Sequence, residues 1–315
     1  MKHARTVAIP TLAIILLIGS SVLAQRPARP AQPQEQDDQV QIRTFEVRLP
    51  ISVKNKDKFV TGLTVNNFEI YEDGKRQKIE DFKAPSQLPL YIAMLVDTSN
   101  SVKLKLPFEK DAGEDFIATV TTFRRKDKVL LASFDSEVAL HQDFTDDQQS
   151  LIAALRKLKA GGVTRMRDAV YRIIEEKLAS VSGNESRRVI VVLSDGEDTA
   201  SERSLKETID MAQRHDVTIF GISTKNFKGI TSGMVENEDD KELRKLCEST
   251  GGQVFLPSEK LQLFKSFSQV AQDLRLEYVL FYKPENQDKT GKPRQIRVKL
   301  VNADGRVHHK QGYIN

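Results

Sequence analysis

The stretch LYIAMLVDTSNS, residues 90–101, decides the fold of this 315-residue chain. Its apolar part, Leu90 to Val96, has the length and composition of a strand that is buried on both faces of a parallel sheet. Its polar part, Asp97 to Ser101, follows at the carboxyl end of that strand, where open α/β sheets bind their ligands. We therefore expect a functional site at this edge of the sheet.

Short apolar runs and longer helical segments alternate through the central part of the chain. This alternation predicts right-handed crossovers between parallel strands, and hence a doubly wound, mostly parallel α/β sheet. The predicted strands are Leu90 to Val96, Val129 to Phe134, Val189 to Leu193, Val217 to Ile222 and Gln253 to Leu256. The predicted helices cover residues 103–123, 147–159, 166–180, 203–214, 238–249 and 259–275.

The segments on either side of this region are rich in β-like runs. Asp73-Gly74 stands between two short runs, which is a strong hairpin signal. Further runs cover Glu277 to Lys283 and Gln295 to Val301, and a last one follows Asp304-Gly305. Because the termini of a compact domain often lie close together, we expect the N- and C-terminal strands to form one small β-sandwich, with the α/β domain inserted between them. Two independent β appendages are the alternative.

Two further polar side chains stand at loop positions in the predicted α/β domain. Thr164 follows Gly161-Gly162, and Asp195 follows the strand predicted to end at Leu193. With the polar residues after Val96 they supply two carboxylates and three hydroxyls, oxygen donors that suit Mg²⁺, Mn²⁺ or Ca²⁺ and disfavour zinc or copper. The predicted metal ligands are Asp97, Ser99, Ser101, Thr164 and Asp195, with Mg²⁺ as the favoured ion. Helix caps for the first four and a plain turn for Asp195 are the alternatives.

These motifs resemble those of a known family. The D-x-S-x-S pattern at residues 97–101, the GGVT run at 161–164 and the LSDG run at 193–196 are similar to the von Willebrand factor type A domain with its metal-ion-dependent adhesion site. The resemblance implies a Rossmann-like fold over roughly residues 89–275. It also implies that Ser99, Ser101 and Thr164 hold the ion through hydroxyls, while Asp97 and Asp195 act directly or through water.

The sequences TRMRDA at 164–169 and TGGQVF at 250–255 also look like bacterial members of the family. The β-rich flanks resemble a group of exported bacterial proteins, common in acidobacteria, that carry this domain between β-rich ends. The flanks therefore bear on architecture and compartment more than on function.

Two further acids are candidates for a supporting role at the predicted metal site. Asp168 could orient the loop of Thr164, or it could cap the first turn of its own helix. Glu197, like its neighbour Asp198, could tune the charge of the site or simply be solvated.

The first 24 residues have a basic start, an apolar stretch and small residues before Gln25, which together indicate a secretory signal peptide cleaved after Ala24. An uncleaved membrane anchor is the alternative. Residues 25–39 are rich in Pro and Gln and are expected to be a disordered tether. The remaining predicted segments are 40–88 (β-rich), 89–275 (the α/β domain) and 276–315 (β-hairpins). We expect an exported protein, periplasmic or extracellular.

Charge and composition argue against nucleic acid as a partner, against an intrachain disulfide and against a zinc site. The formal net charge is +4, and removal of residues 1–24, which hold two basic residues and no acid, leaves +2. Basic and acidic residues are interleaved and Trp is absent, so nucleic acid is not an expected partner. The single cysteine, Cys247, permits no intrachain disulfide, and the five histidines do not form a zinc pattern.

The predicted function is recognition. A divalent cation held by two carboxylates would keep a coordination position open for an acidic side chain of a partner protein. No small-molecule substrate is evident, and the oligomeric state stays open. One alternative is a structural envelope protein that binds partners through its β-sandwich with a non-essential ion. A metal-dependent hydrolase is disfavoured, because Ser99 stands where such an enzyme would need a second aspartate.

Overall fold

The computed structural model describes residues 46–56, 58–84, 88–122, 126–181, 186–195, 198–225, 238–288 and 291–314. The predicted signal peptide (1–24), the tether (25–39) and the first residues of the N-terminal β-rich segment lie outside the described residues. Thr44–Asn315 form one compact unit. Among the described helices, none has the length and apolarity that a membrane span requires.

The central sheet has, within the described residues, six strands in the order β11-β10-β9-β6-β7-β8. All neighbouring pairs are parallel except β7 and β8, which are antiparallel. The α/β prediction with a mostly parallel sheet is therefore confirmed. The strands are β6 (Leu90–Asp97), β7 (Lys128–Phe134), β8 (Val138–Thr145), β9 (Arg187–Ser194), β10 (Val217–Ser223) and β11 (Val254–Phe255).

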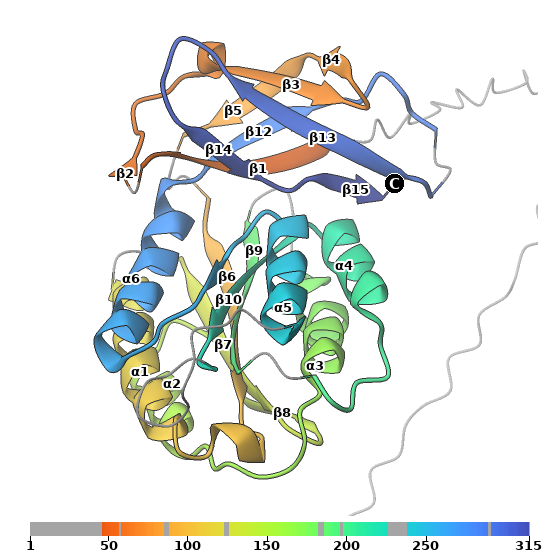
Figure 1. Ribbon diagram of the computed structural model, residues 1–315. Coiled ribbons are helices and arrows are strands. Elements are labelled where there is room, and N and C mark those ends of the chain that lie inside the picture. Colours follow the sequence, from red (N-terminus) through yellow and green to blue (C-terminus); the bar gives the residue numbers. More distant parts are fainter. Residues whose placement is uncertain are drawn as a thin grey trace, which may run out of the picture. The chain divides into compact units, whose positions relative to one another are not determined.

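Helices cover both faces of this sheet, because successive side chains of a strand point to opposite faces. Ile92, Met94 and Val96 of β6 pack on the side of α1 (Leu106–Thr122), α2 (Gln148–Arg156) and α6 (Lys260–Leu276). Ala93 and Leu95 pack on the side of α3, α4 and α5. Figure 1 shows these two helical layers on either side of the sheet. The second layer consists of α3 (Met166–Ile173), α4 (Leu205–Arg214) and α5 (Glu238–Ser249).

The structure differs from the sequence predictions at three places in this domain. The edge strand β8 was not predicted, since its side chains are mostly half-buried or exposed and it lacks an apolar run. The helix expected from residue 103 begins at Leu106, after a 3₁₀ turn at Asn100–Val102. The helix predicted over 166–180 is α-helical to Ile173 and continues as a π-helical turn, Ile174–Leu178.

The strands before β6 and after α6 form two antiparallel sheets. One has the order β14-β1-β12-β5 with β2 paired to β1, and the other has the order β15-β13-β3-β4. Each sheet combines strands from both ends of the described chain, since β1 pairs with β12 and β13 pairs with β3. The strands are β1 (Val47–Asn55), β2 (Lys58–Phe59), β3 (Phe68–Glu72), β4 (Lys75–Gln77), β5 (Ile79–Lys83), β12 (Tyr278–Tyr282), β13 (Pro293–Leu300), β14 (Arg306–His309) and β15 (Gly312–Ile314).

These two sheets share one hydrophobic core, to which β1, β3, β12, β13 and β15 contribute. The expectation of a single small β-sandwich is confirmed, and the alternative of two independent appendages is wrong. The predicted hairpin turn lies between β3 and β4, where Asp73 and Gly74 have φ values of 47° and 83°. Positive φ at both positions fits the tight turn of a two-residue hairpin.

The junction between the β-sandwich and the central domain is made by charged side chains. Arg187, the first residue of β9, pairs with Glu277 and donates to the carbonyl of Leu274, where α6 passes into β12. Both charged side chains are no more than 5% exposed. On the same side, Lys54 of β1 lies 2.9 Å from a carboxylate oxygen of Asp273 in α6. The ion pairs therefore fix the point at which the inserted domain ends.

Arg187→Met is expected to lower the free energy of unfolding by about 3–5 kcal/mol, because it leaves the carboxylate of Glu277 buried without its partner. Urea denaturation would measure this. The control is Arg172→Met, which removes a pair with Glu176 in which both side chains are about half exposed; this variant should change stability by less than about 0.5 kcal/mol. Equal effects of the two substitutions would contradict the assignment of Arg187 as a structural anchor.

Candidate metal centre

Asp97 ends β6 and is completely buried. Its Oδ1 accepts the backbone N–H of Ser99 at 2.8 Å, and its Oδ2 accepts the hydroxyl of Ser194, the last residue of β9, at 2.7 Å. Burial raises the pKa of Asp97 to about 6, although these hydrogen bonds favour the ionised form. The nearby carboxylate of Asp195 acts in the same direction as burial.

The two serines of the motif lie together. The hydroxyl oxygens of Ser99 and Ser101 are 2.9 Å apart. Ser99 is buried and Ser101 is exposed, so the pair reaches from the interior to the surface. Ser99 occupies the N-cap position of the 3₁₀ turn, but its side chain makes no capping hydrogen bond. A helix-capping role therefore does not explain why Ser99 places its hydroxyl here.

The loop that carries Thr164 is bonded to the Asp97 loop through the backbone. The N–H of Gly161 donates to the carbonyl of Thr98 at 2.6 Å, and the N–H of Asn100 donates to the carbonyl of Gly162 at 3.2 Å. Thr164 itself is only 4% exposed. The N-cap of α3 is Arg165, so Thr164 does not occupy the cap position that sequence analysis considered.

Asp195 directly follows β9 and is 4% exposed. Its Oδ2 lies 3.7 Å from the Nζ of Lys105, while its Oδ1 is buried and has no hydrogen-bond partner. A plain turn aspartate would use its oxygens on nearby backbone N–H groups. A buried, unpartnered carboxylate oxygen is costly and is instead the kind of atom that a cation would satisfy.

The structure adds two charged residues that sequence analysis missed. Glu109 in the first turn of α1 is 1% exposed, and Lys105 just before α1 is 4% exposed. Glu109 Oε1 accepts the hydroxyl of Thr224 at 2.7 Å, and its Oε2 is buried without a hydrogen-bond partner. Burial raises the pKa of Glu109 to about 8, with the carboxylates of Asp97 and Asp195 contributing.

A sequence signal for Glu109 did exist. It lies three and seven residues before Ala112 and Phe116, on the buried stripe of α1. A charged residue on such a stripe must face a buried partner, which here is the polar edge of the sheet.

A divalent cation fits this donor set. Asp97, Glu109, Asp195 and Lys105 are all buried, and with every group ionised their formal charge is −2. Because burial raises the pKa of Glu109 to about 8, Glu109 is mostly protonated near neutral pH without an ion, and a divalent cation would favour the ionised form that completes this charge. No group of three or more Asp, Glu, His or Cys placed to hold an ion occurs among the described residues. A cation here would thus depend on the hydroxyls as well as on Asp97 and Asp195.

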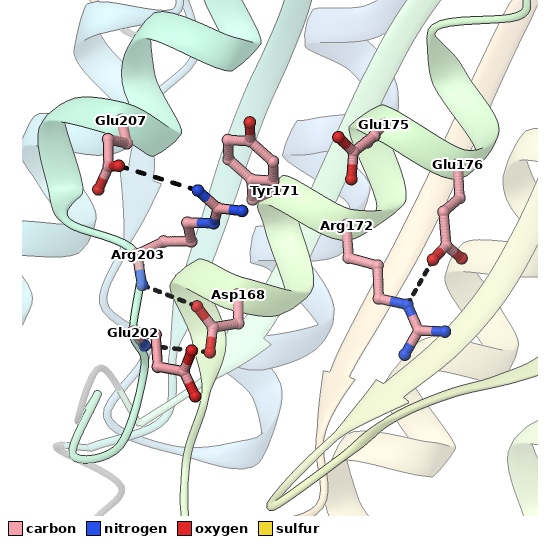
Figure 2. A pocket seen from close by; sticks show the side chains of 8 residues that line it. All are labelled: Asp168, Tyr171, Arg172, Glu175, Glu176, Glu202, Arg203 and Glu207. Carbon is pink, nitrogen blue, oxygen red and sulfur yellow. Dashed lines mark hydrogen bonds and ion pairs between the residues drawn. The ribbon is translucent and has the colours of Figure 1, made fainter.

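Asp168 supports the Thr164 loop from the far side. Its carboxylate pairs with Arg165 at 2.8 Å. It also accepts the backbone N–H groups of Glu202 and Arg203 at 3.1 and 2.9 Å (Figure 2). Burial opposes ionisation of Asp168, but these hydrogen bonds outweigh it and lower its pKa. It therefore binds α3 to the loop after β9 rather than capping its own helix.

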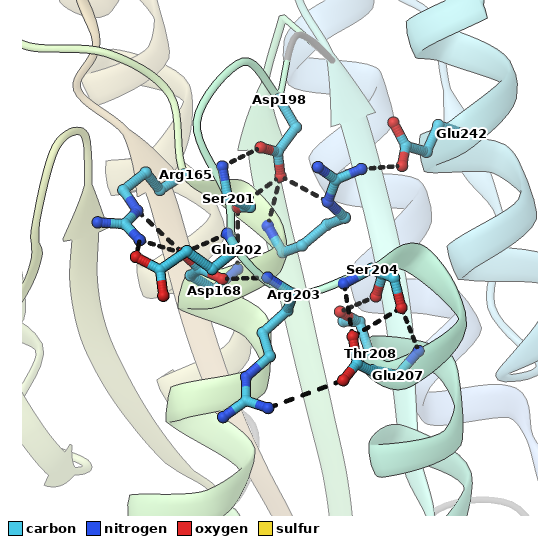
Figure 3. Close-up of polar contacts among 11 residues, drawn as sticks. Arg165, Asp168, Asp198, Ser201, Glu202, Arg203, Ser204, Glu207, Thr208 and Glu242 are labelled. Carbon is cyan, nitrogen blue, oxygen red and sulfur yellow. Dashed lines mark hydrogen bonds and ion pairs between the residues drawn. The ribbon is translucent and has the colours of Figure 1, made fainter.

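Of the two acids after Asp195, Glu197 lies outside the described residues. Of the two possibilities considered for Asp198, a solvated side chain is wrong, because its carboxylate is fully buried. It accepts the backbone N–H of Arg167 at 2.7 Å. It also accepts the hydroxyl of Ser201 at 2.8 Å (Figure 3). Asp198 and Asp168 thus fix the loop after β9 against α3 from two sides.

A cavity of about 520 Å³ lies beside this network, lined by the side chains labelled in Figure 2. Most of its charges are paired: Arg172 binds Glu176 at 2.7 Å, and the guanidinium of Arg203 lies 4.3 Å from the ring centre of Tyr171. The cavity includes none of the five predicted metal ligands.

Gly162→Ala should disturb the Thr164 loop. Gly162 has φ of +79°, and an added Cβ would lie 2.7 Å from Ser136 Oγ. We expect a loss of about 1–2 kcal/mol in the free energy of unfolding, from the left-handed backbone and the clash together. The matched control is Gly161→Ala, where a Cβ would meet no atom within 4 Å. Urea unfolding of both variants tests this, and equal stability of the two would refute it.

The central domain matches a known protein family. The family model of the von Willebrand factor type A domain matches residues 92–270. No curated protein sequence matches the chain significantly. Similar solved structures include a von Willebrand factor type A protein from Catenulispora acidiphila, with 12% identity, TM-score 0.49 and coverage of 87% of this chain and 74% of that one.

Two others are more partial matches. The vWF domain of the type V pili tip protein Mfa5 from Porphyromonas gingivalis has 13% identity and TM-score 0.47, covering 59% of this chain and 94% of that one. The PilB minor pilin from Streptococcus sanguinis has 15% identity and TM-score 0.47, covering 61% of this chain, which spans 62% of the pilin. The family match covers more than half of the sequence, and the chain therefore belongs to the von Willebrand factor type A domain family.

Proposed function

We propose that this protein is an exported protein-binding module that holds a divalent cation, Mg²⁺ in the first place, and uses it to capture an acidic side chain of a partner protein. The residues proposed to hold the ion are Asp97, Ser99, Ser101, Thr164 and Asp195. Export is proposed from the N-terminal sequence, with its basic start and apolar stretch before Ala24.

The observation that carries the proposal is the buried Oδ1 of Asp195, which has no hydrogen-bond partner. It lies one residue beyond Ser194, whose hydroxyl is bonded to Asp97. Two carboxylates at the ends of adjacent strands, with serine hydroxyls beside them, form a hard-oxygen environment that suits Mg²⁺ or Mn²⁺. The ion itself would supply a positive centre that attracts a carboxylate.

The surroundings of the proposed site support a protein as the partner. Ser101 and Asn100 are exposed at its rim. Two apolar side chains on the flanking loops are also exposed, Leu104 at 67% and Val163 at 50%. Large exposed apolar side chains beside a charged centre are typical of a surface that buries area against another macromolecule.

The proposal is for recognition without catalysis. Ser99 stands two residues after Asp97, where a hydrolase of the aspartate type would need a second carboxylate as acid and base. The carboxylate of Asp195 faces the ammonium of Lys105 at 3.7 Å.

Calorimetric titration with Mg²⁺, Mn²⁺ and Ca²⁺ tests metal binding. We expect one ion per chain, with Asp97→Asn and Asp195→Asn each weakening binding by more than about 100-fold, because loss of a ligand costs more than loss of an outer partner. The control is Asp143→Asn, which changes a half-exposed carboxylate on β8 and should bind like the wild type.

Partner capture is tested with the wild-type protein and a displayed peptide library. Selection in Mg²⁺ should enrich peptides with Asp or Glu, and EDTA should release them. Peptides that remain bound in EDTA, or that bind equally to Asp97→Asn, would show that recognition does not use the ion and would favour the β-sandwich as the binding part.

A further inference from the structure

Lys105 lies unusually deep for a lysine. Its side chain is 5% exposed, and its Nζ is 3.7 Å from Oδ2 of Asp195, whose side chain is equally buried. The neighbouring Lys103 and Leu104 are both exposed, so the inward position of Lys105 is specific to this residue. Lysine is almost never fully buried unless its charge is compensated.

The backbone holds Lys105 in this place. Its N–H donates to the carbonyl of Val102 at 2.8 Å, and its own carbonyl accepts the N–H groups of Phe108 at 2.9 Å and Glu109 at 3.1 Å. These bonds join the 3₁₀ turn of the serine motif to the first turn of α1. Lys105 and Glu109 are therefore positioned by the same turn that positions Ser101.

Among the residues that the structure describes, three carboxylates lie in the electrostatic surroundings of Lys105. Asp195 is its direct partner, and the carboxylates of Glu109 and Asp97 belong to the same electrostatic cluster. The 3.7 Å separation from Asp195 exceeds the 2.7–3.2 Å typical of a hydrogen bond, so attraction between charges is the main interaction. A bound divalent ion would use the same carboxylate and would repel the ammonium.

We propose that Lys105 is a built-in counter-cation of the metal site. Its ammonium compensates the buried carboxylates while no ion is bound, and its repulsion limits the affinity for divalent cations when one binds. The inference rests on the proposed function. Lys105 would set the affinity for the ion without being a ligand. When an ion binds, its positive charge would replace that of the Lys105 ammonium as the partner of the buried carboxylates.

The test compares Lys105→Met with Lys103→Met, which removes an exposed lysine two residues away. Calorimetry with Mg²⁺ should give at least about tenfold tighter binding for Lys105→Met, because the repelling charge is gone, and unchanged binding for Lys103→Met. Lys105→Arg, which keeps the charge, should bind no more tightly than the wild type. Lys105→Gln is the substitute if the methionine variant does not fold.

Thermal denaturation gives a second readout. In EDTA, Lys105→Met should melt at a lower temperature than Lys103→Met, because the buried carboxylate of Asp195 loses its counter-charge. Mg²⁺ should then raise its melting temperature by more than it raises that of the wild type, since tighter binding to the folded state stabilises more.

The outcomes separate the two ideas. If the wild type binds Mg²⁺ and Lys105→Met binds it equally or more weakly, Lys105 supports the ligands and the inference is overturned while the proposed function stands. If the wild type fails to bind but Lys105→Met binds, the inference is supported. If none of the variants binds any of the three ions, the proposed function fails and the inference falls with it.

Discussion

The parallel pairing of β6 with β9 positions the whole polar edge of the central domain. Leu90 to Val96 lie opposite Arg187 to Leu193 without a shift in register. Because both strands run in the same direction, their carboxyl ends finish side by side, and the hydroxyl of Ser194 reaches Asp97. A register slip of one residue would turn the side chains of β9 to the opposite faces. The buried apolar side chains on both faces therefore fix the polar groups at the end.

Much of this architecture could be predicted from sequence, because strands buried on both faces of a parallel sheet consist of continuous apolar runs. The apolar runs at β6, β7, β9 and β10 predicted the parallel sheet. The oxygen-bearing residues that follow β6 and β9 predicted the candidate site. The edge strand β8 could not be found this way, since one antiparallel neighbour and an exposed face leave no apolar pattern. Strand order at sheet edges depends on pairings that local sequence does not encode.

The charged residues near the candidate site show a second limit of sequence patterns. Lys105, Glu109 and Asp198 all have buried side chains, although their residue types are typical of surfaces. Each interacts with a group distant in sequence: Asp195 for Lys105, Thr224 for Glu109, and Arg167 for Asp198. These partners become visible only after folding.

The β-sandwich follows the same rule. Glu72 of β3 is buried and receives Arg294 of β13 at 2.9 Å and the hydroxyls of Tyr282 and Tyr313 at 2.7 and 2.9 Å. A carboxylate from the N-terminal strands is thus satisfied entirely by residues that follow the inserted domain. Burying the Glu72 carboxylate is costly unless its hydrogen-bond partners are in place, and these partners come from the C-terminal strands. The sandwich therefore requires the insertion to be complete before its own polar core can close.

The position of β6 between the junction and the site has a mechanical consequence. The chain leaves the sandwich at Pro89, whose carbonyl accepts the N–H of Arg187 at 2.8 Å, and runs directly through β6 to Asp97. At about 3.3 Å per residue, a strand of this length separates the two ends by roughly 25 Å. A force between a ligand at Asp97 and the sandwich would pull along β6. The hydrogen bonds to β7 and β9 lie across that direction, so they would share the load together instead of breaking one after another.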